Sequence, residues 1–174
     1  MSETVLQQWL DDEVRCRAQQ SHPGTIEKDI MKEMTGLEYL QGIAQGKFPF
    51  APMGKTLDFF PVEVEYGRVV FQGTPQLEFY NPIGSVHGGY FCTLLDSAVA
   101  CAVHSTLPKG VGYTTLEIKV NLTRAMTTAT GPIRAEGKVI QVGRQIGIAE
   151  GNIVDVAGKI YGHATTTCLI FPIP

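Results

Sequence analysis

An apolar run from Tyr90 to Leu107 most constrains what this chain can fold into. Asp96 is the only acidic residue within it, so a helix here would be apolar on nearly every face. Such a helix must be enclosed by the rest of the fold or must cross a membrane. Asp96, His104 and several small residues argue against a membrane span, and strand patterns surround the run. We therefore expect a buried central helix and no contact with a membrane.

Segments that alternate between apolar and polar residues flank this run. Before it, a turn at Gly67 joins two expected strands, over 57–66 and 69–79. After it, four strands are expected, over 113–124, 133–142, 145–154 and 159–171. A curved antiparallel sheet wrapped around the helix is the simplest way to enclose it. The pattern therefore predicts an α+β architecture of this kind, the hotdog fold.

Two segments with helical periodicity precede the strands. Residues 1–20 carry an apolar stripe among Gln, Asp and Glu, which is typical of a surface helix. A second helix is expected over 26–45, with a possible interruption at Thr35-Gly36, and residues 48–54 are expected to form a loop. We therefore divide the chain into an N-terminal helical extension, residues 1–35, and a hotdog domain, residues 36–174.

Composition excludes several classes of function. The net charge is −3 and the chain has no basic run, so nothing indicates nucleic acid as a partner. The N-terminus lacks a basic start followed by an apolar stretch, which argues against a signal peptide. The four cysteines show neither a CxxC motif nor a metal-binding spacing. We expect a reduced, cytoplasmic protein without a metal or cofactor.

The chemistry of the chain is concentrated in the stretch from Asn81 to Asp96. A Gly-Gly pair, Gly88-Gly89, opens the apolar helix and leaves N–H groups at the positive end of its dipole. Such groups polarise a carbonyl and stabilise an oxyanion. Asp96 is costly to bury in an apolar helix, so it needs hydrogen-bond partners or a function.

Each of these residues also has a purely structural interpretation. Asp96 could be a buried acid that caps a neighbouring loop, and Asn81 could cap its own loop. His87 could be a hydrogen-bonding residue at the helix start. The glycines could serve close packing of helices across a dimer. His104 and His163 are interpreted as core or surface histidines.

The motif Asn81-Pro-Ile-Gly-Ser-Val-His-Gly-Gly, followed by Asp96, resembles the PaaI-type acyl-CoA thioesterases of the hotdog superfamily. The resemblance covers about residues 36–172. It implies that Asp96 drives hydrolysis of a CoA thioester and that the N–H of Gly88 polarises the thioester carbonyl. It also implies that Asn81 and His87 lie beside that carbonyl.

In the resembling family, a Ser or Thr on the following strand holds the water or the acid. Thr114, eighteen residues after Asp96, matches this position, with Thr115 adjoining it. Strand parity favours Thr114, because it shares the apolar face of Leu116 and Ile118.

Substrate contacts are less defined by the sequence. Gly89, Tyr90 and apolar residues of the segment 48–60 are candidates to line an acyl pocket for aryl-acetyl or medium-chain groups. Arg144, in the turn between two strands, is a candidate contact for the CoA phosphates, with Lys119 and Arg124 as further candidates.

The spacing of Gly88 and Asp96 has a consequence for assembly. Eight residues of helix separate their Cα atoms by roughly 12 Å, too far for both to act on one carbonyl. A working site therefore joins Gly88, His87 and Asn81 of one subunit with Asp96 and Thr114 of another. We expect a homodimer, and the resemblance implies dimers paired again into tetramers.

The leading interpretation is an acyl-CoA thioesterase in which Asp96 acts as nucleophile or as general base for water. The alternative is a non-catalytic acyl-CoA binding or sensing hotdog protein, which would need no acid beside the thioester. A hotdog dehydratase is a third possibility, but the Gly-Gly pair after His87 fits a thioesterase better.

Overall fold

The computed structural model describes residues 2–174, with side chains from Glu3 onward. Four helices come first: α1 (Ser2–Gln19), α2 (Lys28–Lys32), α3 (Gly36–Ala44) and α4 (Pro52–Thr56). Then come β1 (Phe59–Glu65), β2 (Arg68–Gly73), the 3-10 helix η1 (Leu77–Phe79) and the long helix α5 (Gly88–His104). The chain ends with β3 (Val111–Leu122), the 3-10 helix η2 (Thr128–Thr130), β4 (Ile133–Val142), β5 (Ile146–Asp155) and β6 (Ile160–Pro172).

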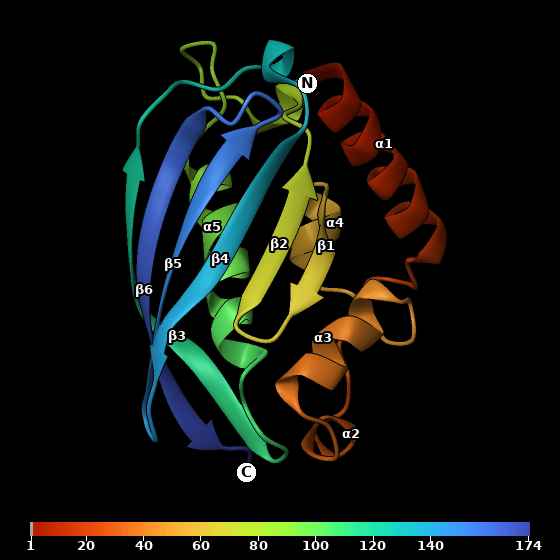
Figure 1. Cartoon of the computed structure of the whole chain (residues 1–174), viewed down its shortest axis with the longest axis vertical. Helices are drawn as coiled ribbons and strands as arrows, with labels where there is room; N and C mark the ends of the chain where they lie inside the picture. Colours follow the sequence, from red (N-terminus) through yellow and green to blue (C-terminus); the bar gives the residue numbers. More distant parts are fainter. Residues whose placement is uncertain (1) are drawn as a thin grey trace.

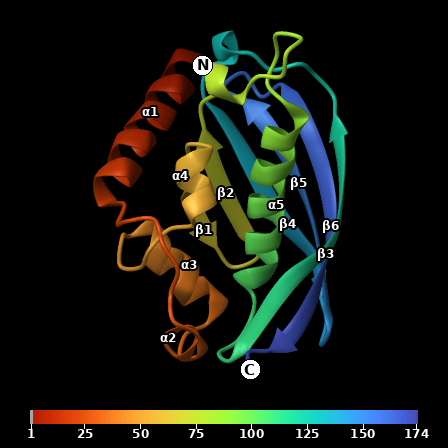
Figure 2. The ribbon, with the colours of Figure 1, turned by 180° about the vertical axis from the view of Figure 1, so that it is seen from behind.

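All six strands form one curved sheet that wraps around α5 (Figures 1 and 2). The strand order is β1-β2-β4-β5-β6-β3, and every neighbouring pair is antiparallel. The hotdog fold predicted from the sequence is confirmed. Because the sheet does not close into a barrel, β1 and β3 are its two edges.

The helix is buried where it meets the concave face of the sheet. Six of its apolar residues have no accessible surface: Leu94, Leu95, Ala98, Val99, Ala102 and Val103. Gly137 of β4 allows this close packing, because a Cβ there would lie 2.3 Å from the carbonyl oxygen of Ala98. No helix within residues 2–174 is long and apolar enough to cross a membrane.

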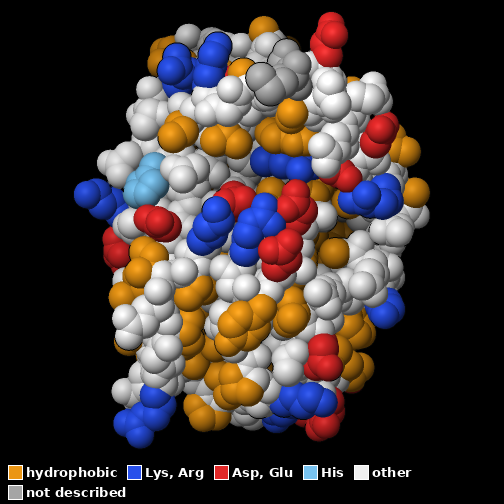
Figure 3. Space-filling model, viewed as in Figure 1, with side chains coloured by type: hydrophobic (Ala, Val, Ile, Leu, Met, Phe, Trp, Pro, Cys, Tyr) orange, Lys and Arg blue, Asp and Glu red, His pale blue; other side chains and the backbone are white. Residues whose placement is uncertain are grey.

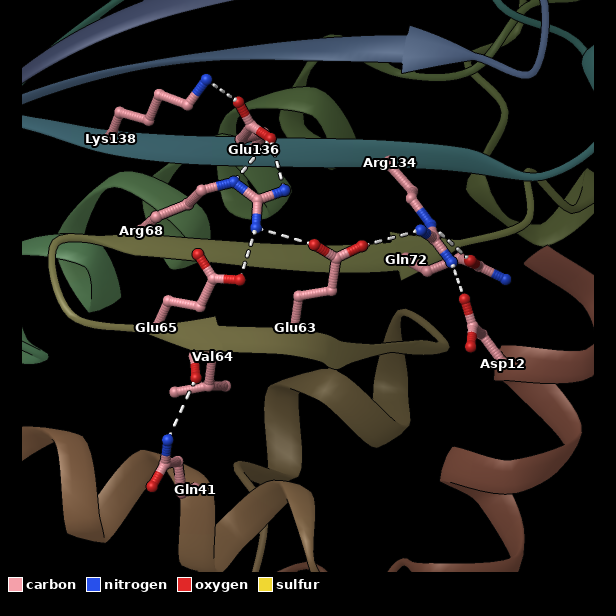
Figure 4. Close-up of polar contacts among 10 residues, drawn as sticks. All are labelled: Asp12, Gln41, Glu63, Val64, Glu65, Arg68, Gln72, Arg134, Glu136 and Lys138. Atoms are coloured by element: carbon pink, nitrogen blue, oxygen red, sulfur yellow. Dashed lines mark hydrogen bonds and ion pairs between the residues drawn. The ribbon is translucent and has the colours of Figure 1, made fainter. Parts of the chain in front are cut away.

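Helix α1 packs on the convex face of the sheet, beside β1 and β2 (Figure 1). Trp9 is buried there and lies 4.6 Å from the guanidinium of Arg134 on β4. Arg134 also donates hydrogen bonds to Asp12 (2.7 Å), Glu63 (3.0 Å) and Gln72 (2.9 Å) (Figure 4). Polar contacts therefore connect α1 to three strands.

Helices α3 and α4 lie beside β1, on the flank of α5 (Figure 2). Thr35 caps α3 with a reciprocal capping box to Glu38, which explains the predicted interruption at Thr35-Gly36. Gly36 packs on the end of α5, where a Cβ would lie 1.8 Å from the carbonyl oxygen of His104.

Two local predictions are wrong. The expected loop 48–54 contains the start of α4, because Pro52 is favourable in the first turn of a helix. The expected strand 69–79 ends at Gly73, and Pro75 follows it, which cannot donate a ladder hydrogen bond. Residues Leu77–Phe79 form η1 instead.

Candidate active site

The loop before α5 is folded by the side chain of Asn81. Its Oδ1 accepts hydrogen bonds from the N–H groups of Ile83 (3.0 Å) and Ser85 (3.5 Å). Its Nδ2 donates to Ser85 Oγ at 3.2 Å. Gly84 adopts a positive φ of 86° at the tip of this turn. The contacts of Asn81 in one subunit are therefore those of a loop-forming residue.

His87 caps the N-terminus of α5. Its Nδ1 accepts a hydrogen bond from the Gly89 N–H at 2.9 Å. This bond leaves the ring proton of a neutral imidazole on Nε2, and the side chain is exposed. The N–H of Gly88, the first residue of the helix, has no acceptor among the described residues. The cap therefore uses one glycine N–H and leaves the other available.

Asp96 is half-buried in the middle of α5. Its Oδ1 accepts a hydrogen bond of 3.0 Å from the Thr115 hydroxyl on β3. Its second carboxylate oxygen has no hydrogen-bond partner within the described chain. One oxygen is therefore oriented and the other is available to a water molecule or an acyl carbon.

Thr115, not Thr114, holds Asp96, and the strand-parity argument for Thr114 is wrong. The register of β3 against β6 shifts between Thr115 and Glu117, which marks a β-bulge at Leu116. A bulge adds one residue and reverses the alternation of faces beyond it. Leu116 is consequently 58% exposed. A catalytic role for Thr114 stays a prediction.

A cavity of about 780 Å³ lies against the exposed flank of α5, and Asp96 and Thr115 line it. Its other walls are mostly aromatic and apolar, including Tyr39, Phe50, Phe59, Phe71, Tyr113 and Phe171. The segment 48–60 contributes to this lining, as the sequence indicated. Lys28 and Met31 of α2 line it too, so the first 35 residues contribute to the cavity. The sequence offered no signal for that contribution.

The other predicted substrate residues do not line this cavity. Tyr90 is buried, with its ring stacked on Phe79 at a centroid distance of 4.8 Å, and burial raises the pKa of its hydroxyl. Gly89 is exposed at the start of α5. Arg144 is exposed in the β4–β5 turn. Gly147, three residues later, packs on Val103 near the end of α5. Arg144 and Gly88 therefore lie toward opposite ends of the helix.

The described residues contain no group of three or more His, Cys, Asp or Glu side chains that would hold a metal ion. The groups described above that bear on chemistry are the helix N-terminus, the hydrogen-bonded carboxylate and the largely apolar cavity. This combination suits hydrolysis of an acyl group, in which one element polarises the carbonyl and the carboxylate drives the attack.

The fold and these groups define a hotdog protein of the hydrolytic kind, and comparison with known proteins agrees. The family model of the thioesterase superfamily matches residues 83–160. A protein of Saccharolobus solfataricus named "putative esterase" is 30% identical over 110 residues, which are 63% of this chain and 76% of that protein. The chain belongs to the thioesterase superfamily.

A second relative, also named "putative esterase", comes from Halobacterium salinarum and is 39% identical over 74 residues. That match spans 42% of this chain and about half of the relative, 48%. Family membership thus supports a hydrolase, without defining its substrate.

Solved structures place the chain with the PaaI-like hotdog thioesterases. A Ralstonia eutropha protein titled "putative thioesterase, phenylacetic acid degradation-related protein" superposes with a TM-score of 0.69 at 26% identity, over 75% of this chain and 98% of that one. The PaaI protein of the Escherichia coli phenylacetic acid degradation operon shares the fold, with a TM-score of 0.68 at 20% identity. Coverage is 78% of this chain and 95% of that one.

Proposed function

We propose that this protein is an acyl-CoA thioesterase that hydrolyses an aryl- or medium-chain acyl-CoA to the free acid and CoA. The hydrogen bond between Thr115 and Asp96, at the wall of a large apolar cavity, carries this proposal. It provides an oriented carboxylate next to a space that suits an acyl group. An acyl-CoA sensor would have no use for a carboxylate oriented in this way.

In the proposed reaction, the Gly88 N–H donates to the thioester oxygen as negative charge develops there. The His87 Nε2–H would donate beside it, since Nδ1 already accepts from the Gly89 N–H. Asp96 either removes a proton from the attacking water or attacks the acyl carbon to form an anhydride that water then opens. Both routes break the carbon–sulfur bond and release CoA as a thiol.

One subunit does not bring these groups together, because Gly88 and Asp96 are eight residues apart on α5. We propose that a second copy completes the site. The edge of β3 is free for pairing, and Leu116 and Leu122 on it are 58% and 50% exposed. The uncovered face of α5 carries small side chains, including Thr93 and Ser97, which would allow close approach of a second helix.

The contacts of β3 suggest the register of this pairing. Thr115 contacts Asp96, whereas Leu122 contacts Gly88, with its Cδ1 3.2 Å from where a Gly88 Cβ would lie. If two β3 edges pair antiparallel around a two-fold axis between Ile118 and Lys119, Thr115 of each copy lies opposite Leu122 of the other. That register would bring each Asp96 toward the helix N-terminus of its partner.

The same arrangement suggests where the CoA phosphates would bind. Lys119 and Arg124 are exposed and stand in the chain on either side of Leu122, the β3 residue that contacts Gly88 at the start of α5. We propose these two cations as phosphate contacts in preference to Arg144, which lies toward the other end of the helix.

Release of free CoA thiol from phenylacetyl-, benzoyl-, hexanoyl- and palmitoyl-CoA tests the proposed function. We expect turnover of at least one thioester by the wild type and a loss of about 100-fold or more in Asp96→Asn. Asp11→Asn, an exposed acid on α1, is the matched control. Binding without turnover by the wild type would instead establish the sensor alternative.

A further inference from the structure

The cavity extends beyond Asp96 and Thr115 to a further polar group, His104, in the last turn of α5. Its imidazole is only 7% exposed and lies between two tyrosines of neighbouring elements. The ring centroids are 5.6 Å from Tyr39 of α3 and 4.9 Å from Tyr113 of β3. Gly36 abuts the same ring, since a Cβ there would lie 2.7 Å from His104 Cδ2. The imidazole is therefore held in place by its surroundings.

Burial lowers the pKa of His104 to about 4, so the ring is neutral near pH 7. The charged side chains that line the same cavity are Lys28 of α2 and Asp96 of α5. Its neighbours Tyr39, Tyr113 and Cys101 also have pKa values raised by burial. A neutral imidazole offers one N–H donor and one nitrogen acceptor, and neither is hydrogen-bonded to another described residue.

A buried donor and acceptor without partners are costly unless a bound group satisfies them. The ring nitrogens do not rank among the fully enclosed unsatisfied atoms, of which the described chain has only the Tyr90 hydroxyl. His104 lines the cavity and its ring nitrogens are not fully enclosed, so a bound group in that space can reach the ring. At this end the cavity wall thus presents a fixed imidazole beside the rings of Tyr39 and Tyr113.

The position of His104 relative to Asp96 sets the size of the ligand. Eight residues along α5 separate their Cα atoms by roughly 12 Å. Subtracting contacts of about 3 Å at each end leaves roughly 6 Å for the acyl group. A six-carbon chain or a single aromatic ring with one methylene spans that length.

We propose that His104 is a specificity-determining residue that selects acyl groups with a neutral hydrogen-bonding group, such as a hydroxyl, at their far end. This inference rests on the proposed function, since it assigns the acyl end of the substrate to the cavity beside Asp96. Lys28, which also lines the cavity, is the competing group, because it would favour a carboxylate at that position instead.

The test compares kcat/KM for matched thioesters that differ only at the far end: hexanoyl-, 6-hydroxyhexanoyl- and adipoyl-CoA. We expect the wild type to favour the hydroxylated chain over the plain chain by about tenfold, the effect of one buried hydrogen bond. His104→Phe keeps a ring of similar size and should reduce this ratio to about one. His104→Gln keeps a donor and an acceptor and should restore part of it.

The ratio is taken within each variant, so a partly folded preparation does not distort it. His163→Phe makes the same substitution on the outer face of β6 and should keep the wild-type ratio. An unchanged ratio in His104→Phe, or a wild-type preference for adipoyl-CoA, would overturn the role of His104. Turnover of none of the thioesters would instead refute the proposed function itself.

Discussion

A single side chain, that of Thr115, orients the carboxylate of the proposed site. Asp96 has one hydrogen-bond partner among the described residues, the Thr115 hydroxyl at 3.0 Å. That bond orients one oxygen and leaves the other toward the cavity. A carboxylate held by a single donor should be sensitive to the loss of that donor.

Replacing Thr115 with Val should lower kcat about tenfold or more, because a hydrogen bond to a charged group is worth about 1.5–3 kcal/mol. Thr114→Val is the comparison, since it makes the same substitution at the adjacent residue, which lines the same cavity but does not hydrogen-bond to Asp96. Steady-state kinetics of CoA release measure both. A larger loss in Thr114→Val would restore the assignment suggested by strand parity.

A second prediction isolates the N–H of Gly88. Proline is favourable at the first position of a helix, and the extended His87 before it (φ −62°, ψ 138°) is compatible with a following proline. Gly88→Pro should therefore keep α5 and remove the N–H, with a loss of about 100-fold in kcat, although its ring also adds a Cβ near Leu122. Gly88→Ala keeps the N–H and adds a methyl near Leu122, so it should retain most of the activity. Equal losses of kcat in the Pro and Ala variants would instead indicate that the added carbon crowds Leu122.

His104 makes stability depend on pH. Its pKa falls from an ordinary value of 6.5 to about 4 on folding, because burial disfavours the charged ring. Below about pH 6.5 the unfolded chain binds the proton first, so this residue lowers stability as the pH falls toward 4. Between pH 7.5 and pH 5 the loss should be about 2 kcal/mol. Urea unfolding of the wild type and His104→Phe at both pH values measures this loss. An equal loss of unfolding free energy in the two proteins would contradict the prediction.

Among the secondary-structure elements, α1 is attached to the sheet largely through polar contacts. Figure 3 shows acidic and basic side chains gathered over the middle of the convex face. Arg134 has a side chain only 7% exposed and connects Asp12 of α1 with Glu63 of β1 (Figure 4). A buried charge that loses a partner is destabilising.

Asp12→Asn should therefore loosen α1 by about 2 kcal/mol, since Glu63 would remain as the one acidic partner of Arg134 among the described residues. Hydrogen exchange of the backbone amides in residues 2–19 should accelerate, while exchange in α5 stays slow. Asp11→Asn, one residue away and exposed, should leave exchange unchanged. Unchanged exchange in Asp12→Asn would mean that the other contacts of α1, such as buried Trp9 and the Arg17–Asp58 ion pair, suffice to hold the helix.

In the whole molecule, the proposed site requires two copies of the chain. The uncovered face of α5 and the free edge of β3 lie side by side, and the two halves of the site lie on them. This arrangement predicts that a substitution that prevents dimer formation also lowers catalytic activity.

Subunit mixing tests this prediction directly. Asp96→Asn and Gly88→Pro should each be nearly inactive, but a mixed dimer contains one site in which both residues are intact. Co-refolding equal amounts should recover up to about a quarter of the wild-type activity, from statistical pairing of two-fold dimers. Recovery of no activity, while mixed dimers are detected by mass spectrometry, would contradict a shared site.

A charge on the edge of β3 should separate the copies. Leu116→Asp is expected to shift the protein to a monomer and to lower activity by at least tenfold, because an unpaired charge would lie in the interface. Val14→Asp, on an exposed position of α1, is the matched control. Sedimentation velocity and activity are measured on the same samples, and an active monomer would refute the shared site.

The sequence by itself determined the architecture of this protein. The apolar run that became α5 had to be enclosed, and the strand patterns supplied the sheet that encloses it. The order of the residues from Asn81 to Asp96 also placed a helix N-terminus and a carboxylate on one helix, because these are local features of the chain. Periodicity and capping depend on near neighbours, which a single sequence displays.

Only the tertiary structure decided which threonine meets Asp96 and what surrounds the cavity. The bulge at Leu116 arises from the pairing of β3 with β6, and no sequence pattern within β3 predicts it. Lys28 and His104 reach the cavity only because α2, α3 and α5 meet there. Contacts between segments far apart in the chain depend on the balance of packing across the whole fold, so residue spacing alone does not reveal them.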